Sequence, residues 1–244
     1  MNLELPALKR IHAKRLREVY RSAGWPCLDV VEIDLMAAGL LERVVSNGGL
    51  EHVRVTDAGI HYLAESAANN RKAMSAHDAL VDIVAQNMAR DGRLVWKGLS
   101  LRAQLPPPDN ESKARWKMCM PDVFSIRNSS KQEYLEPIVH EIKVSRADLL
   151  GDLKLIDKRS AYLDLGGQCW YVLGCNAKGQ AIGEPEEIPG ECGVMVYASD
   201  KLEVVRMAPK KEAKGLPFSV WMALAKAAPA IRGQEDSYLV DPLL

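Results

Sequence analysis

The hydrophobic residues near the start of this 244-residue chain recur at helical spacing. Apolar positions three or four residues apart predict an amphipathic helix, which ends before the turn sequence at 24–26. The apolar positions of this helix are Leu8, Ile11, Leu16, Val19 and Tyr20. A second helix is predicted at 28–36. Two strands then flank the hairpin turn at 46–49, and Thr56 is the predicted N-cap of a third helix.

The order helix, helix, two strands, helix resembles a winged-helix domain, which we expect over residues 1–70. Residues 38–41 and 55–59 are especially similar to the wings of bacterial transcription regulators. Six basic side chains lie on the outer face of the first helix: Lys9, Arg10, Lys14, Arg15, Arg17 and Arg21. This face predicts a module that holds the protein on DNA. The alternative is a packing or dimerisation domain whose basic helix is simply solvated.

Beyond residue 75 the apolar runs become shorter and richer in β-branched residues, as is typical of strands. They predict strands at 94–101, 121–126, 138–144, 169–173, 193–197 and 202–207, and helices at 80–88, 148–165 and 218–227. The strand–helix–strand order after residue 138 implies parallel pairing. We therefore expect an α/β domain over residues 71–230, with a mixed sheet flanked by helices. Residues 66–75 are a linker or extend a helix, and residues 231–244 form a tail.

Two charged residues, Glu141 and Lys143, interrupt the apolar strand predicted at 138–144. Side chains alternate along a strand, so both residues project from the same face. A carboxylate and an ammonium group inside a buried strand are costly unless they are paired or bind something. Asp122 begins the neighbouring strand and can come alongside them. The sequence thus predicts a polar site at this place, and the alternative is a salt-bridged sheet edge beside a surface Pro-Asp turn.

The chemistry of these three residues suits phosphodiester hydrolysis. Carboxylates such as Asp122 and Glu141 bind Mg²⁺ or Mn²⁺, together with waters and backbone carbonyls. A metal bound there lowers the pKa of its water and neutralises the phosphate that is to be cleaved. Lys143 is suited to orient that water and to stabilise the charge that develops on the phosphate.

The spacing of Pro121-Asp122 and Glu141-x-Lys143 resembles the PD-(D/E)XK phosphodiesterase superfamily. The longer run 140–154, followed by 162–164, is similar to MmcB-type DNA-repair endonucleases, and this resemblance covers roughly residues 75–229. It implies a restriction-endonuclease-like fold that cleaves or repairs DNA, with Asp122, Glu141 and Lys143 in the active site. In this superfamily an acid from the preceding helix often joins the metal site. Asp78 or Asp82 is therefore a further candidate ligand, and a solvated acidic face is the alternative.

Further basic residues are candidates for contact with nucleic acid. Arg146 and Lys154 follow the Glu-x-Lys motif, on the polar side of the next predicted helix, and are expected to contact DNA. Trp116 is surrounded by three basic residues, Lys113, Arg115 and Lys117. Basic residues around an aromatic ring can grip phosphates and stack a base. The alternative is that Trp116 belongs to the hydrophobic core.

Composition narrows the possible functions and locations of the protein only slightly. The formal net charge is zero, so local basic patches, and not the whole chain, support binding to nucleic acid. No apolar run is long enough to span a membrane, and no signal peptide is recognisable. The five cysteines lack the spacing of a zinc site and are expected to be reduced thiols. We therefore expect a cytoplasmic, nucleoid-associated bacterial protein.

Together these features predict a Mg²⁺- or Mn²⁺-dependent deoxyribonuclease of repair type, positioned on its substrate by the N-terminal domain. RNA is an alternative substrate, and the N-terminal domain is a possible dimer contact. One alternative function is a DNA-binding regulator or adaptor whose nuclease fold is vestigial. Another is a restriction-type nuclease, although no stretch of the sequence reads as a base-recognition element.

Overall fold

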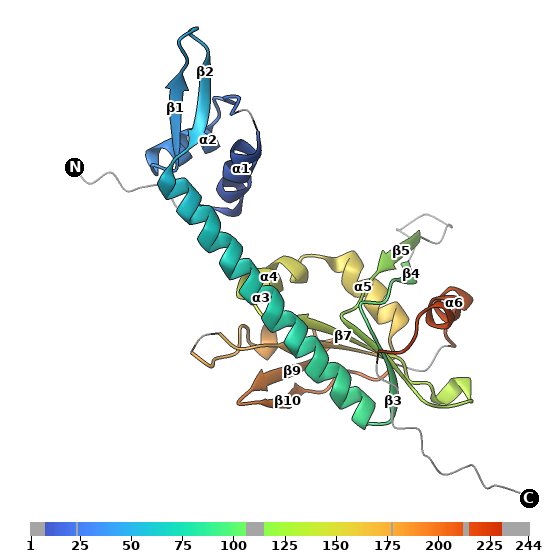
Figure 1. Ribbon diagram of the computed structural model, residues 1–244. Coiled ribbons are helices and arrows are strands. Elements are labelled where there is room, and N and C mark those ends of the chain that lie inside the picture. Colours follow the sequence, from blue (N-terminus) through green and yellow to red (C-terminus); the bar gives the residue numbers. More distant parts are fainter. Residues whose placement is uncertain (1–7, 23, 106–114, 177, 212–214, 231–244) are drawn as a thin grey trace, which may run out of the picture. The chain divides into compact units, whose positions relative to one another are not determined.

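Figure 1 shows the computed structural model, which describes residues 8–22, 24–105, 115–176, 178–211 and 215–230. The chain folds into two compact units, Met1–Met74 and Ser75–Leu244, against an expected boundary at residue 70. Helix α3 (Asp57–Arg90) passes through this boundary without interruption, so residues 66–75 extend a helix and do not form a linker. The tail expected at 231–244 lies outside the described residues, and so does Lys113.

The first unit has the predicted order of elements. It contains α1 (Arg10–Arg21), α2 (Val30–Ala37), the antiparallel strands β1 (Leu41–Val45) and β2 (Glu51–Val55), and the start of α3. Its core consists of Leu16, Val19, Leu35, Leu40, Leu41 and Val53. Thr56 is confirmed as the N-cap of α3, because its Oγ1 accepts a hydrogen bond from the N–H of Gly59 at 3.1 Å.

The predicted buried face of α1 is partly wrong. Ile11 and Tyr20 are 56% and 62% exposed, whereas His12 and Ala13 are buried. A buried histidine needs polar partners, and His12 has two: its Nε2 lies 3.0 Å from Asp34 Oδ2, and its Nδ1 accepts the N–H of Lys9 at 2.8 Å. A pattern of apolar positions alone does not identify this polar contact with α2.

The second unit is built on a mixed six-stranded sheet, which confirms the α/β class. The strand order is β10-β9-β8-β7-β6-β3. In chain order these strands are β3 (Arg93–Lys97), β6 (Val123–Arg127), β7 (Ile138–Lys143), β8 (Gln168–Leu173), β9 (Gly193–Ala198) and β10 (Lys201–Arg206). Strand β7 pairs in parallel with β8 and antiparallel with β6, as the strand–helix–strand order predicts for the β7–β8 pair.

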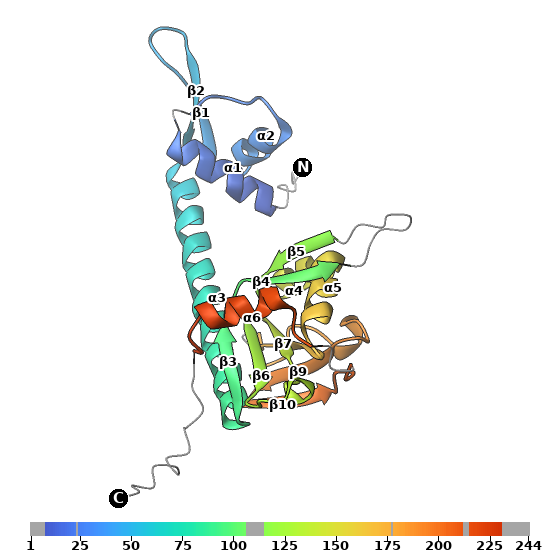
Figure 2. The same cartoon turned by 90° about the vertical axis from the view of Figure 1, so that its right-hand side faces the viewer.

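Helices cover both faces of this sheet (Figures 1 and 2). The C-terminal half of α3 covers one face, where Val84 and Ala85 pack with Ile142 of β7 and Val172 of β8. The other face is covered by α4 (Arg146–Leu153), α5 (Ile156–Leu165) and α6 (Phe218–Lys226). Within the described residues, no helix has the length and apolar character needed to cross a membrane.

Two predicted elements are each divided in the structure. The strand expected at 94–101 ends as β3 at Lys97, and Gly98 then takes a positive φ of 57° before a new strand begins. This new strand, β4 (Leu101–Leu105), pairs only with β5 (Arg115–Cys119), in a separate two-stranded sheet. The helix expected at 148–165 is interrupted at Leu155, which separates α4 from α5. Two short 3-10 turns, Gln132–Tyr134 and Pro185–Glu187, complete the unit.

Candidate active site

Asp122 is held against the strand that carries Glu141. It directly precedes β6, which runs antiparallel to β7 with Val123 opposite His140. Its Oδ2 accepts a hydrogen bond from the backbone N–H of Ile142 at 2.7 Å. The carboxylate therefore lies beside Glu141, and the structure brings together the three residues Asp122, Glu141 and Lys143.

Glu141 and Lys143 project from β7 into a buried cluster of charges. Their side chains are only 3% and 6% exposed, and Lys143 Nζ lies 2.6 Å from Glu141 Oε1. A second ammonium group, Lys158 Nζ on α5, reaches the same oxygen at 2.5 Å. Asp152 on α4 accepts a hydrogen bond from Lys158 at 2.5 Å and lies 3.5 Å from Lys143. Asp148 Oδ2 lies 3.3 Å from Lys143 Nζ at the exposed side.

The break between α4 and α5 brings Asp152 and Lys158 together. Residues six apart in one continuous helix would project from different faces, because each residue turns the helix by about 100°. The interruption at Leu155 redirects the chain, so that Lys158 Nζ reaches Asp152 Oδ1. Ser145 fixes the start of α4, where its Oγ accepts the N–H of Asp148 at 3.2 Å. Tyr171 of β8 completes the cluster by donating to Asp152 Oδ2 at 2.8 Å.

Burial and charge act together on the pKa values of this cluster. Burial raises the pKa of Glu141 and the charge of Asp122 raises it further, while Lys143 and Lys158 oppose both effects. Burial alone would lower the pKa of Lys143, but the charge and hydrogen bond of Glu141 outweigh it and the pKa rises. Burial would also raise the pKa of Asp152, yet its Lys158 hydrogen bond holds that pKa below the usual value. Glu141 is therefore more readily protonated than Asp152.

The α3 residue that contacts Asp122 is a histidine and not one of the predicted acids. His77 Nε2 lies 3.4 Å from Asp122 Oδ1, and its Nδ1 lies 3.4 Å from Asp78. Asp78 itself is 68% exposed, and Asp82 pairs with Lys97 at 2.6 Å. The expectation that Asp78 or Asp82 joins a metal site stays a prediction, and the residue of this helix that lies beside Asp122 is His77.

The donor set fits a hard divalent cation. Among the described residues, Glu141 Oε2 is buried without a hydrogen-bond partner, since the nearby Tyr162 hydroxyl, whose pKa is raised by burial and by Glu141, donates to Met120 O instead. Such an atom calls for a ligand. Asp122 supplies a second carboxylate that is 20% exposed. Over the described ranges, no group of three or more His, Cys, Asp or Glu side chains is arranged to hold a metal. Two carboxylates are nevertheless enough for Mg²⁺, which commonly binds one or two carboxylates with waters and substrate phosphates completing its shell.

The basic residues predicted to contact DNA differ in their exposure and in whether an acidic side chain pairs with them. Lys9, Arg10, Lys14 and Arg21 are exposed on unit 1, with Lys14 Nζ 3.9 Å from Glu18 Oε1, whereas Arg17 is half-buried. Arg15 is ion-paired with Asp29 and lies 3.6 Å from Glu18. In unit 2, Lys154 is exposed. Arg146 forms a bidentate pair with Glu187, with both distances 2.5 Å, so its charge is already matched.

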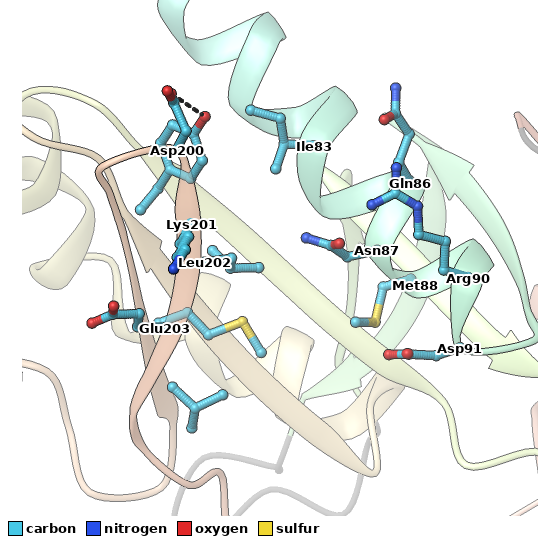
Figure 3. A pocket seen from close by; sticks show the side chains of 13 residues that line it. Ile83, Gln86, Asn87, Met88, Arg90, Asp91, Asp200, Lys201, Leu202 and Glu203 are labelled. Atoms are coloured by element: carbon cyan, nitrogen blue, oxygen red, sulfur yellow. Dashed lines mark hydrogen bonds between the residues drawn. The ribbon is translucent and has the colours of Figure 1, made fainter.

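A separate pocket of about 640 Å³ lies between α3 and the strands β9 and β10 (Figure 3). It is lined by residues of α3, including Asn87 and Arg90, and by residues of β10, including Lys201 and Glu203. Its lining contains none of the predicted site residues. The pocket lies on the face of the sheet that α3 covers, opposite the face that carries Glu141 and Lys143.

Comparison with known proteins identifies few similarities. No protein-family model matches the chain, and no curated protein matches it. One solved structure is similar, the SPO1766 protein of unknown function from Silicibacter pomeroyi, with 22% identity and a TM-score of 0.37. The match covers 59% of this chain and 77% of that chain, and it is too low to support a conclusion about fold or function.

Proposed function

We propose that this protein is a metal-dependent phosphodiesterase that acts on DNA, an endonuclease of repair type, as the resemblance to PD-(D/E)XK and MmcB-type proteins implies. One observation carries the proposal: Glu141 Oε2 is buried without a partner beside Asp122, while two lysines occupy Oε1. A purely structural ion pair satisfies its buried oxygens, because an unpaired one costs about 1–3 kcal/mol. An oxygen left free within reach of a second carboxylate is suited to bind a cation.

Asp122 and Glu141 would hold Mg²⁺ or Mn²⁺, which supplies an activated water and neutralises phosphate charge. Asp122 is oriented for this role by the amide of Ile142, which fixes one of its two oxygens. Lys143 Nζ is held by Glu141 Oε1 beside the two carboxylates, where its charge would stabilise a phosphate that binds there. Lys158 donates to the same oxygen and opposes the increase that burial causes in the pKa of Glu141.

The exposed basic residues of α1 support a role for unit 1 in holding DNA. Replacing Lys9, Arg10, Lys14 and Arg21 together by Gln should weaken DNA binding and flatten its dependence on salt. Each neutralised phosphate contact contributes about 0.9 to the slope of log affinity against log salt for duplex DNA. Fluorescence anisotropy at several salt concentrations measures this slope. An unchanged slope would make unit 1 an interaction module for protein.

The catalytic part of the proposal is tested with the purified full-length protein. Single-stranded, duplex, flapped and mismatched DNA are incubated with Mg²⁺, with Mn²⁺ or with EDTA, and products are separated on a denaturing gel. We expect metal-dependent cleavage inside at least one of these substrates. RNA of the same sequence is included to separate a deoxyribonuclease from a general nuclease.

The contacts of Glu141 Oε1 favour one rival, a DNA-binding protein whose nuclease fold is vestigial. Two ammonium groups on one carboxylate oxygen form a cluster that can also be purely structural. In that case no substrate would be cut with any metal, while the Gln variants of α1 would still lose DNA affinity.

A further inference from the structure

The two-stranded sheet of β4 and β5 has one buried face and one exposed face. Leu101, Ala103 and Leu105 of β4 point into the core, together with Cys119 of β5. Helix α6 packs on this buried side, because Val220 and Leu224 belong to the same core. Side chains alternate along a strand, so the neighbouring positions must face away from the core.

The outward face carries large side chains that are open to solvent. Trp116, Met118 and Met120 recur at every second position and are 46%, 62% and 59% exposed. Across the sheet, Met118 lies opposite Arg102 and Trp116 lies opposite Gln104, and both polar residues are exposed. A run of exposed apolar residues on one strand face indicates a binding surface.

The guanidinium group of Arg102 lies over the ring of Trp116, with its Cζ 4.7 Å from the ring centroid. This cation–π contact holds the indole in place and adds positive charge to its surroundings. Arg102 is the basic residue of this outward face, which carries no acidic one, whereas Arg115 and Lys117 lie opposite Leu105 and Ala103 and belong to the other face of the two strands. Two acids from α5 approach them: Asp157 lies 3.4 Å from Arg115, and Asp164 accepts the backbone N–H of Gln104 at 2.9 Å.

This surface leads directly to the candidate active site. Met120 is followed by the buried Pro121 and then by Asp122. The carbonyl of Met120 accepts a hydrogen bond from Tyr162 Oη on α5 at 3.1 Å, which anchors the connecting backbone. A strand of nucleic acid lying along β5 would therefore be directed toward Asp122 and Glu141.

We propose that the outward face of β4 and β5 is a stacking platform for the unpaired bases of single-stranded nucleic acid. Trp116 supplies the flat surface, and Arg102, which lies on the same face, supplies charge for the phosphates. The proposal rests on the proposed function, and it specifies that the substrate has a single-stranded segment next to the bond that is cut. Nucleic acid is the occupant we argue for, because this face carries Arg102 and no acid and continues along the chain to Asp122 of the candidate site.

The test measures binding by the full-length protein in EDTA, so that cleavage plays no part. Labelled single strands of about 20 nucleotides are compared by anisotropy: oligothymidylate, oligouridylate, a fully abasic strand and a blunt duplex. Trp116→Ala should weaken binding of the two base-containing strands on the order of tenfold for each stacked base, and should leave the abasic strand unaffected. Trp116→Phe should retain most of the affinity. The better of the two base-containing strands identifies DNA or RNA as the ligand.

A matched control is Phe218→Ala on α6, which removes an aromatic side chain that is 78% exposed beside the buried face of β4. Its single-strand affinity should equal that of the parent. Photo-crosslinking of the unaltered protein to 5-iodouracil strands gives a second measurement, and the adduct should map to residues 115–120. Parent-like binding by Trp116→Ala, equal losses on the abasic strand, or an adduct outside β4 and β5 would each overturn the platform.

These outcomes can be told apart from failure of the proposed function. A parent protein that cuts DNA, together with a Trp116→Ala variant that binds single strands equally well, removes only the platform. A parent protein that neither binds nor cuts nucleic acid removes both proposals.

Discussion

The two faces of strand β7 differ in the partners that surround their buried polar side chains. On one face, Glu141 and Lys143 are buried and charged, and two further charged side chains, Asp152 and Lys158, meet them within 3.5 Å. On the other face, His140 is fully buried below α3, and neither of its ring nitrogens has a hydrogen-bond partner in the part of the chain that the structure describes. The residues are neighbours in sequence, so the difference comes from what each face packs against.

The comparison shows which buried groups keep their charge. Burial lowers the pKa of His140 to about 3, with a further contribution from the positive charge of Arg93, so the ring stays neutral. Arg93 itself is satisfied by neutral acceptors: its Nε donates to Ser125 Oγ at 2.9 Å and its Nη2 to Ser125 O at 3.2 Å. On the Glu141 face, opposite charges lie side by side and hold the pKa of Lys143 above, and that of Asp152 below, the usual value. Because ion pairs buried in this way often add little stability over apolar residues, their presence here supports a functional role.

The largest effect is expected from removing a carboxylate on the charged face. Asp122→Asn and Glu141→Gln keep the size of the side chain, and Asn can still accept the Ile142 N–H. Both variants should lose Mn²⁺ affinity and cut no detectable DNA. DNA binding in EDTA should equal or exceed that of the parent, because a negative charge near the phosphates is removed. Calorimetric titration of Mn²⁺ beside a gel assay checks both points. Cleavage by both variants would reduce the motif to a coincidence of spacing.

The next effect separates Lys143 from the carboxylates. Lys143→Ala should leave Mn²⁺ binding in place, because an ammonium group is no ligand, and should lower turnover by about 10²–10³-fold. Glu141 keeps Lys158 as a partner, so the fold should tolerate the change. Lys143→Met, which preserves the apolar stem, serves as the matched variant. Loss of metal binding in both variants would show that Lys143 supports the carboxylates structurally.

A smaller effect concerns the stability of the charged face. Lys158→Met removes hydrogen bonds to both Glu141 and Asp152, and should lower the free energy of unfolding by about 3 kcal/mol. Lys154→Met, at an exposed position just after α4, should change it by less than about 0.5 kcal/mol. Urea denaturation followed by circular dichroism measures both values. Equal effects of the two variants would mean that the cluster does not depend on Lys158.

The smallest expected effect concerns His140, on the face of β7 that α3 covers. An unfolded His140 binds a proton near pH 6.5 while the folded one does not, so protonation favours unfolding as the pH falls below 6.5. By pH 5 this costs about 2 kcal/mol of stability relative to pH 7. His140→Leu should remove that loss, and no hydrogen bond is sacrificed. Denaturation curves at the two pH values measure the difference, and an equal loss in parent and variant would show that His140 is protonated when folded.

Sequence patterns were sufficient where local periodicity controls structure. The alternation around Glu141 and Lys143 predicted their common face, and the order of strands predicted the parallel β7–β8 pair. The approach of Asp122 to β7 followed from the same antiparallel geometry. These features depend on strand period and connection length, both of which can be read along the chain.

Other features of the site depend on contacts between distant residues. Lys158 joins Glu141 because the helix breaks at Leu155, and the nearest glycine, Gly151, lies inside α4 and does not mark the break. The sequence does not indicate the contact between His77 and Asp122, because this contact depends on where Asp122 lies in the fold and not on the sequence neighbours of His77. Asp152 and Tyr171 come from separate elements, and only the packing of α4 on β8 brings them together. The sequence shows an acid and a base six residues apart, Asp152 and Lys158. This spacing predicts no contact in one continuous helix, so the pair is recognisable only once the break at Leu155 is known.

The hydrogen bond from Ile142 to Asp122 gives the candidate site an internal spectroscopic reporter. An amide proton shared with a carboxylate has a resonance frequency that depends on the charge of that carboxylate. In an isotope-labelled protein, the Ile142 cross-peak of a proton–nitrogen correlation spectrum should therefore move when Asp122 is protonated or coordinates a cation. A single backbone signal would then follow the occupancy of the site without any substitution in it.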